Sequence, residues 1–335
     1  MGNFVIVYHW REGATALTDL LSKHPNVCVP LFEEADQHHP NAFATPENIH
    51  VRLDALFATG DLESARSSLG MPGGVNGRVS ASVGFKWRIW GEPERIAEVL
   101  RKHDVTVFHV FRLNALEWAV SRYFSTCIVP ALEPQIGIKF VTDVNPQFGF
   151  ATLTREEQDA VRQVLHAYRF AVPADFVAAS MKELWAFKEN VCTTYMDVMH
   201  GHGVPVHAIF YEDFVRRRDV LLQYMCRALA LDPVPLHECE PWYQKVASEN
   251  LLAQVENIES LRASGELRAL QRSYHDMIRG HHPLALEFGD DLQVKRPAAA
   301  GRSRLRWPLA SDGLRSKSRA SSRATARSAI RTPTR

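Results

Sequence analysis

Apolar residues follow two spacings along the chain, one typical of buried strands and one typical of helices. Residues 3–8 (NFVIVY) form a short continuous apolar run, which is the pattern of a parallel strand covered on both faces. Gly13 follows this run. Over 14–24 apolar residues then recur at helical spacing, up to Pro25, because proline disfavours helical geometry in the residue before it. The chain therefore begins with a predicted strand, loop and helix.

The same alternation of strands and helices continues along the chain. Further strands are predicted at 27–31, 80–90, 105–111 and within 200–214. Helices are predicted at 92–103, 115–125, 154–200, 215–231 and 243–275, with a break near Gly265 in the last of these. Strands that alternate with helices predict an α/β fold with a central parallel sheet flanked by helices.

Charge divides the chain into a large acidic part and a short basic part. Residues 301–335 hold ten Lys and Arg and one acidic residue, Asp312, which leaves 29 basic and 37 acidic residues in 1–300. We predict a single α/β domain at 1–297. The tail 298–335 is rich in Arg, Ser and Ala without apolar periodicity, so we expect a disordered basic tail. Such a tail can contact nucleic acid or an anionic membrane, but we expect a solvated extension with no specific nucleic-acid binding.

Several classes of protein are disfavoured by composition. No stretch approaches the roughly 18 to 20 consecutive apolar residues of a membrane-spanning helix. The first residues lack the charged lead-in of a signal peptide, so we expect a cytoplasmic protein. The five cysteines are odd in number and show no CxxC spacing, which favours buried thiols over disulfides. No His, Cys or Asp cluster has metal-ligand spacing, so no metal site is predicted.

The loop between the first strand and the first helix is expected to carry the chemistry. Ligands of parallel sheets lie at the carboxyl ends of the strands, where a helix N-terminus offers unpaired N–H groups to an anion. Gly13 lets the backbone approach closely, Thr15 adds a hydroxyl, and Arg11 can neutralise a negative charge. The GxxxxGK[ST] pattern is absent, which disfavours ATP or GTP chemistry of that type.

Residues 8–27 (YHWREGATALTDLLSKHPNV) resemble the 5′-phosphosulfate loop of PAPS-dependent sulfotransferases. Arg11, Gly13, Thr15 and Leu17 match that pattern, as does the HPNV that follows the helix. The resemblance implies a P-loop-like three-layer fold, with PAPS (3′-phosphoadenosine 5′-phosphosulfate) as co-substrate and no metal.

The loop is a degenerate version of the family pattern. Trp10 replaces proline, Glu12 replaces serine, and Ala14 replaces serine or threonine. Glu12 brings a carboxylate to the place where an anion is expected, so it must point away if the site is to bind well. The resemblance implies that the nucleotide contacts six consecutive residues here, namely Arg11, Glu12, Gly13, Ala14, Thr15 and Ala16.

A second segment, FHVFRLNALEWAVSRYF, resembles the unit that holds the 3′-phosphate in the bacterial Nod-factor-like, carbohydrate-type branch of this family. The matching residues are Arg112, Asn114, Leu116, Val120 and Ser121. Arg112 ends a predicted strand, and Ser121 lies about two turns into the next helix. A guanidinium and a hydroxyl at this spacing can converge on one phosphate.

Three further segments are similar to the same branch, in the same order along the chain. VGFKWRIW is similar to a Gly-x-Lys strand, which makes Lys86 a candidate for contact with either the donor or the acceptor. VHAIFYEDF is similar to a strand in which Tyr211 and Glu212 are expected to brace the sheet. QKVASENLLAQVENIESL is similar to a late element in which Lys245 is a candidate to reach the nucleotide.

The resemblance implies transfer of a sulfuryl group from PAPS by in-line displacement, in which the protein mainly positions groups and stabilises charge. Arg11 is expected to stabilise the charge that builds on the bridging oxygen of the donor. Glu34 is the first candidate for the base, and Glu33 is the alternative, because two adjacent carboxylates can raise one pKa toward neutrality. His38 and His39 are further candidates.

The acceptor is expected to bind between the pattern-poor segment 40–80 and the helical segment 130–200, both predicted as acceptor-side insertions. The resemblance favours a hydroxyl of a carbohydrate or glycolipid-like acceptor. Two other classes stay open. One is a catalytically impaired sulfotransferase-like protein that only binds the nucleotide. The other is a different nucleotide-dependent transferase, such as a kinase.

Overall fold

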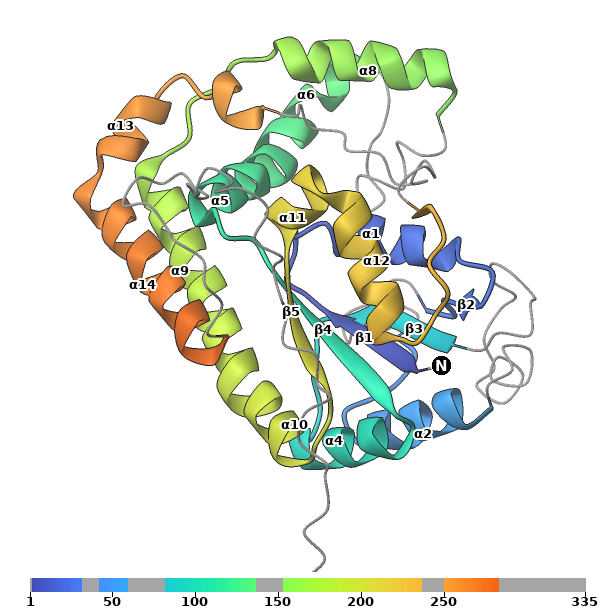
Figure 1. The fold of residues 1–335 in the computed structure, drawn as a ribbon. Helices are drawn as coiled ribbons and strands as arrows, with labels where there is room; N and C mark the ends of the chain where they lie inside the picture. The colour runs from blue at the N-terminus through green and yellow to red at the C-terminus, as the bar shows by residue number, and fades with distance from the viewer. Residues whose placement is uncertain (1, 32–41, 60–81, 137–152, 237–249, 283–335) are drawn as a thin grey trace, which may run out of the picture. The chain divides into compact units, whose positions relative to one another are not determined.

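Five parallel strands form one sheet in the computed structural model, which describes residues 2–31, 42–59, 82–136, 153–236 and 250–282 (Figure 1). The strand order is β2-β3-β1-β4-β5, and every neighbouring pair is parallel. The strands are β1 (Asn3–Val7), β2 (Val27–Cys28), β3 (Ser82–Trp87), β4 (Val105–Phe111) and β5 (Val206–Phe210). Helices flank this central parallel sheet, so the predicted α/β fold class is confirmed.

Helices follow the strands and also form a separate group after β4. They are α1 (Ala14–Ser22), α2 (Ile49–Thr59), α4 (Pro93–Lys102), α5 (Ala115–Tyr123), α6 (Val129–Ile136), α8 (Arg155–Ala167), α9 (Ala174–Val191), α10 (Asp197–Gly201), α11 (Tyr211–Arg216), α12 (Arg218–Ala228), α13 (Ile258–Ala263) and α14 (Gly265–His281). Shorter turns are the π-helical η1 (Phe124–Ile128) and η2 (Cys192–Met196) and the 3₁₀ turn η4 (Leu251–Gln254).

Two expectations about these elements were wrong. The segment 40–80 was predicted to lack pattern, yet 49–59 within it form helix α2, whose Leu53 and Phe57 are buried. The second strand was predicted at 27–31, but it is only two residues long.

The sheet is covered on both faces because successive side chains of a strand point to opposite sides. Val5 and Val7 of β1 lie in one core cluster with residues of α2, α4 and η2. Phe4 and Ile6 lie in another, with residues of α1 and α12. These two clusters explain why β1 appears as a continuous apolar run in the sequence.

A third core cluster joins α5, α9 and α14 to the carboxyl ends of two strands. It includes Phe111, the last residue of β4, and Phe210, the last residue of β5. This group of helices therefore packs where the strands end (Figure 1).

The strand order favours ligand binding at the end of β1. The chain leaves β1 toward β2 on one side, while β4 lies on the other side. In open α/β sheets, ligands bind outside the carboxyl ends of the strands at such a reversal of direction.

All described residues belong to the compact unit Met1–Arg296. No helix in the described ranges has the length and hydropathy needed to cross a bilayer.

Candidate functional site

The loop after β1 turns sharply before α1 begins. Two of its residues have positive φ angles, Arg11 at 64° and Gly13 at 77°. Gly13 is the N-cap of α1, and a Cβ atom added to it would lie 2.8 and 2.9 Å from ring carbons of Tyr211. The left-handed backbone and the close ring both require glycine at this position. Arg11 has a side chain and is therefore strained, as residues at functional sites often are.

The N-terminus of α1 presents backbone donors without a capping side chain. No side chain caps the helix, and its first turn holds no acidic residue. The first N–H groups of any helix have no partner within the helix. Ala14, Thr15 and Ala16 therefore contribute N–H groups, and the lack of a hydroxyl at Ala14 leaves this backbone cradle unchanged.

Arg112 joins this loop from the end of the neighbouring strand. It follows β4 directly, and its side chain is buried. Its Nη1 donates a hydrogen bond of 3.0 Å to the carbonyl oxygen of Arg11. Its guanidinium carbon lies 4.6 Å from the centroid of the Tyr211 ring. The structure thus brings together the two arginines that the sequence indicated.

The two arginines differ in their charge partners. Glu117 lies 2.8 Å from Arg112, and although burial opposes the charge, Glu117 and Tyr211 raise the pKa of Arg112. Burial and then the charge of Arg112 lower the pKa of Arg11 to about 10. Within the described part of the chain, Arg11 forms no ion pair with a carboxylate. An anion bound beside Arg11 would relieve this unfavourable pairing of like charges.

A third cation reaches the loop from β3. The Nζ of Lys86 donates a hydrogen bond of 2.7 Å to the hydroxyl of Thr15, and Lys86 is only 1% exposed. Gly84, two residues earlier, leaves room for the ring of Phe4, because an added Cβ would lie 2.3 Å from that ring. In the Gly-x-Lys pattern, Gly84 therefore serves packing, and Lys86 supplies the charge. The lysine at the N-terminus of α1 comes from β3 and not from the loop.

Ser121 lies on the same side of α5 as Glu117, the residue that pairs with Arg112. Glu117 contacts Arg112, and Ser121 is four residues further along the helix, so the two side chains share a face. Ser121 is 8% exposed. Asn114 has a different role, since its side chain caps α5 by accepting a hydrogen bond of 3.0 Å from the N–H of Glu117.

The turn that carries Arg112 is held from two sides. Glu212 accepts hydrogen bonds of 3.1 Å from the N–H groups of Leu113 and Asn114. From α14, Gln271 donates a bond of 2.7 Å to the carbonyl oxygen of Leu113, and Nε2 of His275 lies 2.9 Å from the same oxygen. The expectation that Glu212 has a structural role agrees with these bonds. Gln271 and His275 were missed, because buried polar residues on an amphipathic helix carry no motif.

Glu12 points into the protein and not toward the open side of the loop. Its Oε2 accepts hydrogen bonds from the N–H of His9 at 2.6 Å and from Nζ of Lys188 at 2.7 Å. Both carboxylate and ammonium have 0% side-chain exposure. Burial raises the pKa of Glu12 to about 7, against the charge of Lys188, and burial lowers the pKa of Lys188. Sequence reasoning missed Lys188, which lies far along the chain in α9 and belongs to no motif.

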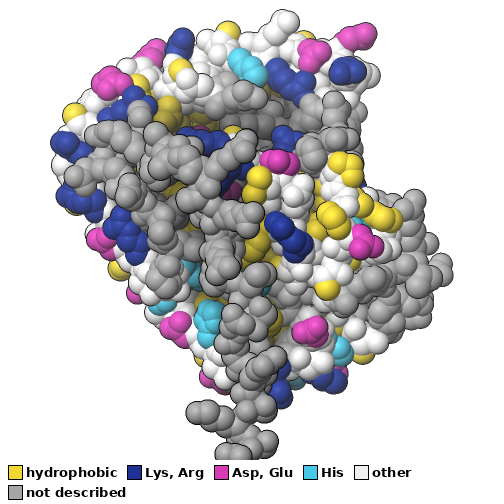
Figure 2. Space-filling model, in the orientation of Figure 1, with side chains coloured by type: hydrophobic (Ala, Val, Ile, Leu, Met, Phe, Trp, Pro, Cys, Tyr) yellow, Lys and Arg dark blue, Asp and Glu magenta, His cyan; other side chains and the backbone are white. Residues whose placement is uncertain are grey.

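Trp10 leads into the loop and is 44% exposed. Two arginines flank its ring, with the guanidinium carbon of Arg88 at 4.6 Å and that of Arg122 at 5.9 Å from the centroid. Lys and Arg side chains gather in a hollow of the surface near α5 and α11 (Figure 2). The cationic character of this end of the sheet is therefore not confined to the loop.

The remaining predicted site residues are not among those that the structure describes. They are the four candidates for the base, Glu33, Glu34, His38 and His39, and the candidate nucleotide contact Lys245. Their roles stay predictions.

Comparison with known proteins gave matches only among solved structures. No family model and no curated protein sequence matches the chain. A sulfotransferase from Alicyclobacillus acidocaldarius is similar at 18% identity and a TM-score of 0.36, over 82% of this chain and 99% of that one. The sulfotransferase domain from the curacin biosynthetic pathway is similar at 12% identity and 0.36, over 83% and 97%. The sulfotransferase domain from the Synechococcus PCC 7002 olefin synthase is similar at 14% and 0.35, over 83% and 94%.

Proposed function

We propose that this chain is a PAPS-dependent sulfotransferase that acts in the cytoplasm on a hydroxyl of a carbohydrate or glycolipid-like acceptor. One observation carries the proposal. Arg11 lies beside Arg112 without a carboxylate partner among the described residues, at a helix N-terminus that no side chain caps. This arrangement favours binding of a multiply charged anion.

In this proposal, different residues bind the 5′-phosphosulfate and the 3′-phosphate of the donor. The 5′-phosphosulfate binds the N–H groups at the start of α1, together with Arg11, Thr15 and Lys86. The 3′-phosphate binds Arg112 and Ser121, whose helix face is fixed by the contact of Arg112 with Glu117. Glu12, Ala14 and Ala16 belong to the cradle through their backbone only.

Transfer then proceeds by in-line displacement at sulfur. The acceptor oxygen forms a bond to sulfur while the bond from sulfur to the bridging oxygen of PAPS breaks. The acceptor proton passes to Glu34, or to Glu33 as the alternative base. Arg11 and Lys86 stabilise the negative charge left on the bridging oxygen of the product PAP (3′-phosphoadenosine 5′-phosphate).

The orientation of Glu12 weakens the alternative of a nucleotide-binding protein without catalysis. That alternative depended on a carboxylate facing the bound anion and on the missing hydroxyl at position 14. Because Glu12 is paired with Lys188 in the interior, the first of these reasons is removed.

Thermal unfolding with PAP, ATP and GTP separates the candidate classes, because a ligand that binds only the folded state raises its stability. We expect PAP to raise Tm clearly more than ATP or GTP. Transfer of labelled sulfate from PAPS to a panel of glycans then distinguishes an enzyme from a binding protein. Stabilisation by ATP alone would favour a kinase.

Arg112→Ala is expected to weaken PAP binding ten-fold or more, which corresponds to about 1.4 kcal/mol. The variant removes the guanidinium that holds both the loop carbonyl and the phosphate. Arg95→Ala is the matched control, because Arg95 is exposed on α4 and pairs only with Glu92 in the described structure. Equal PAP affinity in both variants, measured by calorimetry, would remove Arg112 from the site.

Glu34→Gln is expected to abolish turnover and to leave PAP affinity unchanged, since the base acts on the acceptor and not on the nucleotide. Glu33→Gln, one residue away, is the comparison variant that tests the alternative base. Full activity in Glu34→Gln together with loss in Glu33→Gln would transfer the role to Glu33.

A further inference from the structure

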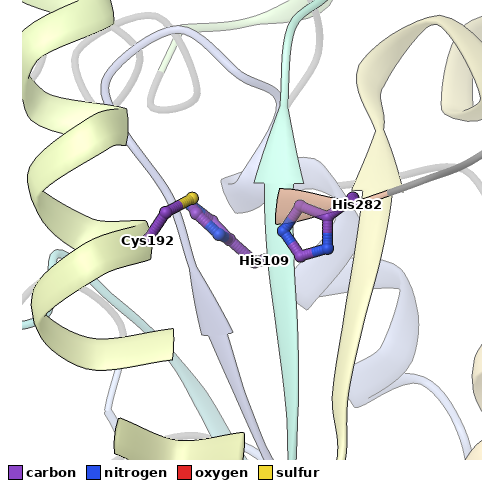
Figure 3. Close-up of side chains that lie close together, drawn as sticks. All are labelled: His109, Cys192 and His282. Atoms are coloured by element: carbon purple, nitrogen blue, oxygen red, sulfur yellow. The ribbon is translucent and has the colours of Figure 1, made fainter. Parts of the chain in front are cut away.

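Three side chains capable of binding a metal meet beside β4, outside the residues assigned to the nucleotide. They are His109, Cys192 and His282 (Figure 3), and one ligand atom from each lies within 4.8 Å of the other two. His109 belongs to β4, Cys192 is the first residue of η2, and His282 directly follows α14. They are more than 80 positions apart along the chain, so no sequence spacing reveals them.

Two of the three side chains have a buried nitrogen that lacks a hydrogen-bond partner. His109 is 0% exposed, and among the described residues nothing bonds to its Nδ1 or to Nε2 of His282. A buried polar atom left without a partner costs about 1–3 kcal/mol, and in native proteins such an atom usually has a bound water, ion or role. An imidazole whose ring nitrogen has no other partner can bind a metal ion through that nitrogen.

The sulfur completes a donor set that suits a borderline-soft cation. Cys192 is fully buried, and its Sγ lies within 4.8 Å of a ring nitrogen of each histidine. Thiolate and imidazole together are ligands typical of Zn²⁺, and carboxylate-preferring ions such as Mg²⁺ and Ca²⁺ are disfavoured.

The neighbouring lysine is compatible with a bound cation. Lys188 lies 3.5 Å from Nε2 of His109, at the outer limit of a hydrogen bond, and it leaves Nδ1 open. Its shorter bonds go to Glu12 at 2.7 Å and to the carbonyl of Val110 at 2.5 Å. The carboxylate of Glu12 compensates the ammonium, and a thiolate at Cys192 adds a second negative charge.

We propose that His109, Cys192 and His282 bind one Zn²⁺ ion, with the fourth position left to water or a small ligand. Bonds of about 2.3 Å to sulfur and about 2.0 Å to nitrogen hold tetrahedral donors about 3.3–3.5 Å apart, so the ligand atoms, within 4.8 Å of one another, need to close by at most about 1.5 Å. On binding, the S–H bond of Cys192 breaks, a bond from sulfur to zinc forms, and the proton leaves to solvent without any redox change. The ion links β4, η2 and the end of α14.

Co²⁺ is the probe for this site, because tetrahedral thiolate-bound cobalt shows a near-ultraviolet charge-transfer band and visible d–d bands. The full-length protein is titrated with Co²⁺ and then with Zn²⁺. We expect one equivalent of Co²⁺ to produce these bands, Zn²⁺ to remove them, and Zn²⁺ to raise Tm. A protein with reduced thiols that gives no charge-transfer band would overturn the proposal.

Two variants locate the ion. Cys192→Ser is expected to lose the charge-transfer band, whereas Cys226→Ser, which changes a buried thiol of α12, is expected to keep it. His282→Ala, at a half-buried position beyond the helix end, is expected to weaken Co²⁺ binding at least ten-fold and to remain folded. If Cys192→Ser unfolds by circular dichroism, the His282 variant decides, and unchanged Co²⁺ affinity in it refutes the site. Neither outcome depends on nucleotide binding, so the result stands apart from the proposed sulfotransferase activity.

Discussion

Gly13→Ala tests the geometry of the loop by adding a single methyl group. The backbone there has φ 77°, where a residue with a Cβ loses about 1–2 kcal/mol relative to the right-handed region. The new methyl also meets the ring of Tyr211 at 2.8 and 2.9 Å, and overpacking of this kind costs about 1–3 kcal/mol. We therefore expect the free energy of unfolding to fall by about 2–5 kcal/mol.

A second glycine separates these two contributions. Gly203 has φ 75°, and a Cβ added to it meets nothing within 4 Å, so Gly203→Ala carries the backbone cost alone. Urea unfolding followed by tryptophan fluorescence gives both free energies, provided that the dependence on urea concentration is unchanged. With an unfolding entropy of about 2.1 cal/mol/K per residue over the length of the compact unit Met1–Arg296, the Gly13 variant is expected to lose about 3–8 °C in Tm.

The same variant is expected to weaken PAP binding at least ten-fold, because a displaced Tyr211 ring moves the Arg112 guanidinium that lies 4.6 Å from it. Gly203→Ala is expected to leave PAP affinity unchanged. Equal losses of stability in Gly13→Ala and Gly203→Ala would refute the contact with Tyr211. Unchanged PAP affinity in a destabilised Gly13 variant would refute the placement of the nucleotide at this loop.

Two further predictions concern buried polar groups around the site. Burial lowers the pKa of His275 from 6.5 to about 4. Between pH 6.5 and pH 4 the unfolded chain therefore binds a proton at this imidazole more strongly than the folded protein does. The free energy of unfolding is thus highest above pH 6.5 and decreases as the pH falls toward 4. In His275→Gln we expect the decrease in the free energy of unfolding over this pH range to be smaller by up to about 3 kcal/mol. Urea unfolding at several pH values measures it, and the same pH dependence in the variant and the natural protein would contradict the prediction. Lys188→Met removes the charge partner of the buried Glu12 carboxylate, which keeps only the N–H of His9 as donor, and is expected to cost about 3–5 kcal/mol in urea unfolding. Adding Glu12→Gln is expected to recover part of that loss, and strict additivity of the two changes would show that the pair is not coupled.

The elements of the sheet were predictable because buried parallel strands have a distinctive sequence pattern. The run predicted at 105–111 is β4 with the same bounds, and the adjoining helices differ from expectation by only a few residues. Helix α2 was missed for a physical reason. Apolar residues in its first turns alternate with polar ones, at Ile49, Val51 and Leu53, as in a strand, and Val51 is in fact exposed.

Neighbouring residues within one sequence motif could be predicted to lie together, whereas residues that reach the site only through tertiary packing could not. Arg11, Gly13 and Thr15 share one turn, so their proximity follows from the sequence. Lys188 and His275 reach the site only because α9 and α14 pack against the ends of the strands. No local spacing encodes such contacts, since their position depends on how the whole domain closes.

The late position of α14 in the chain matters during synthesis. The three cations of the proposed nucleotide site, Arg11, Lys86 and Arg112, belong to the first 112 residues, but the helix that bonds to the carbonyl of Leu113 begins only at Gly265. A nascent chain thus displays its charged groups long before the turn behind Arg112 is locked. If the proposed nucleotide site is correct, the nascent chain gains full affinity for the nucleotide only after α14 has emerged from the ribosome and docked.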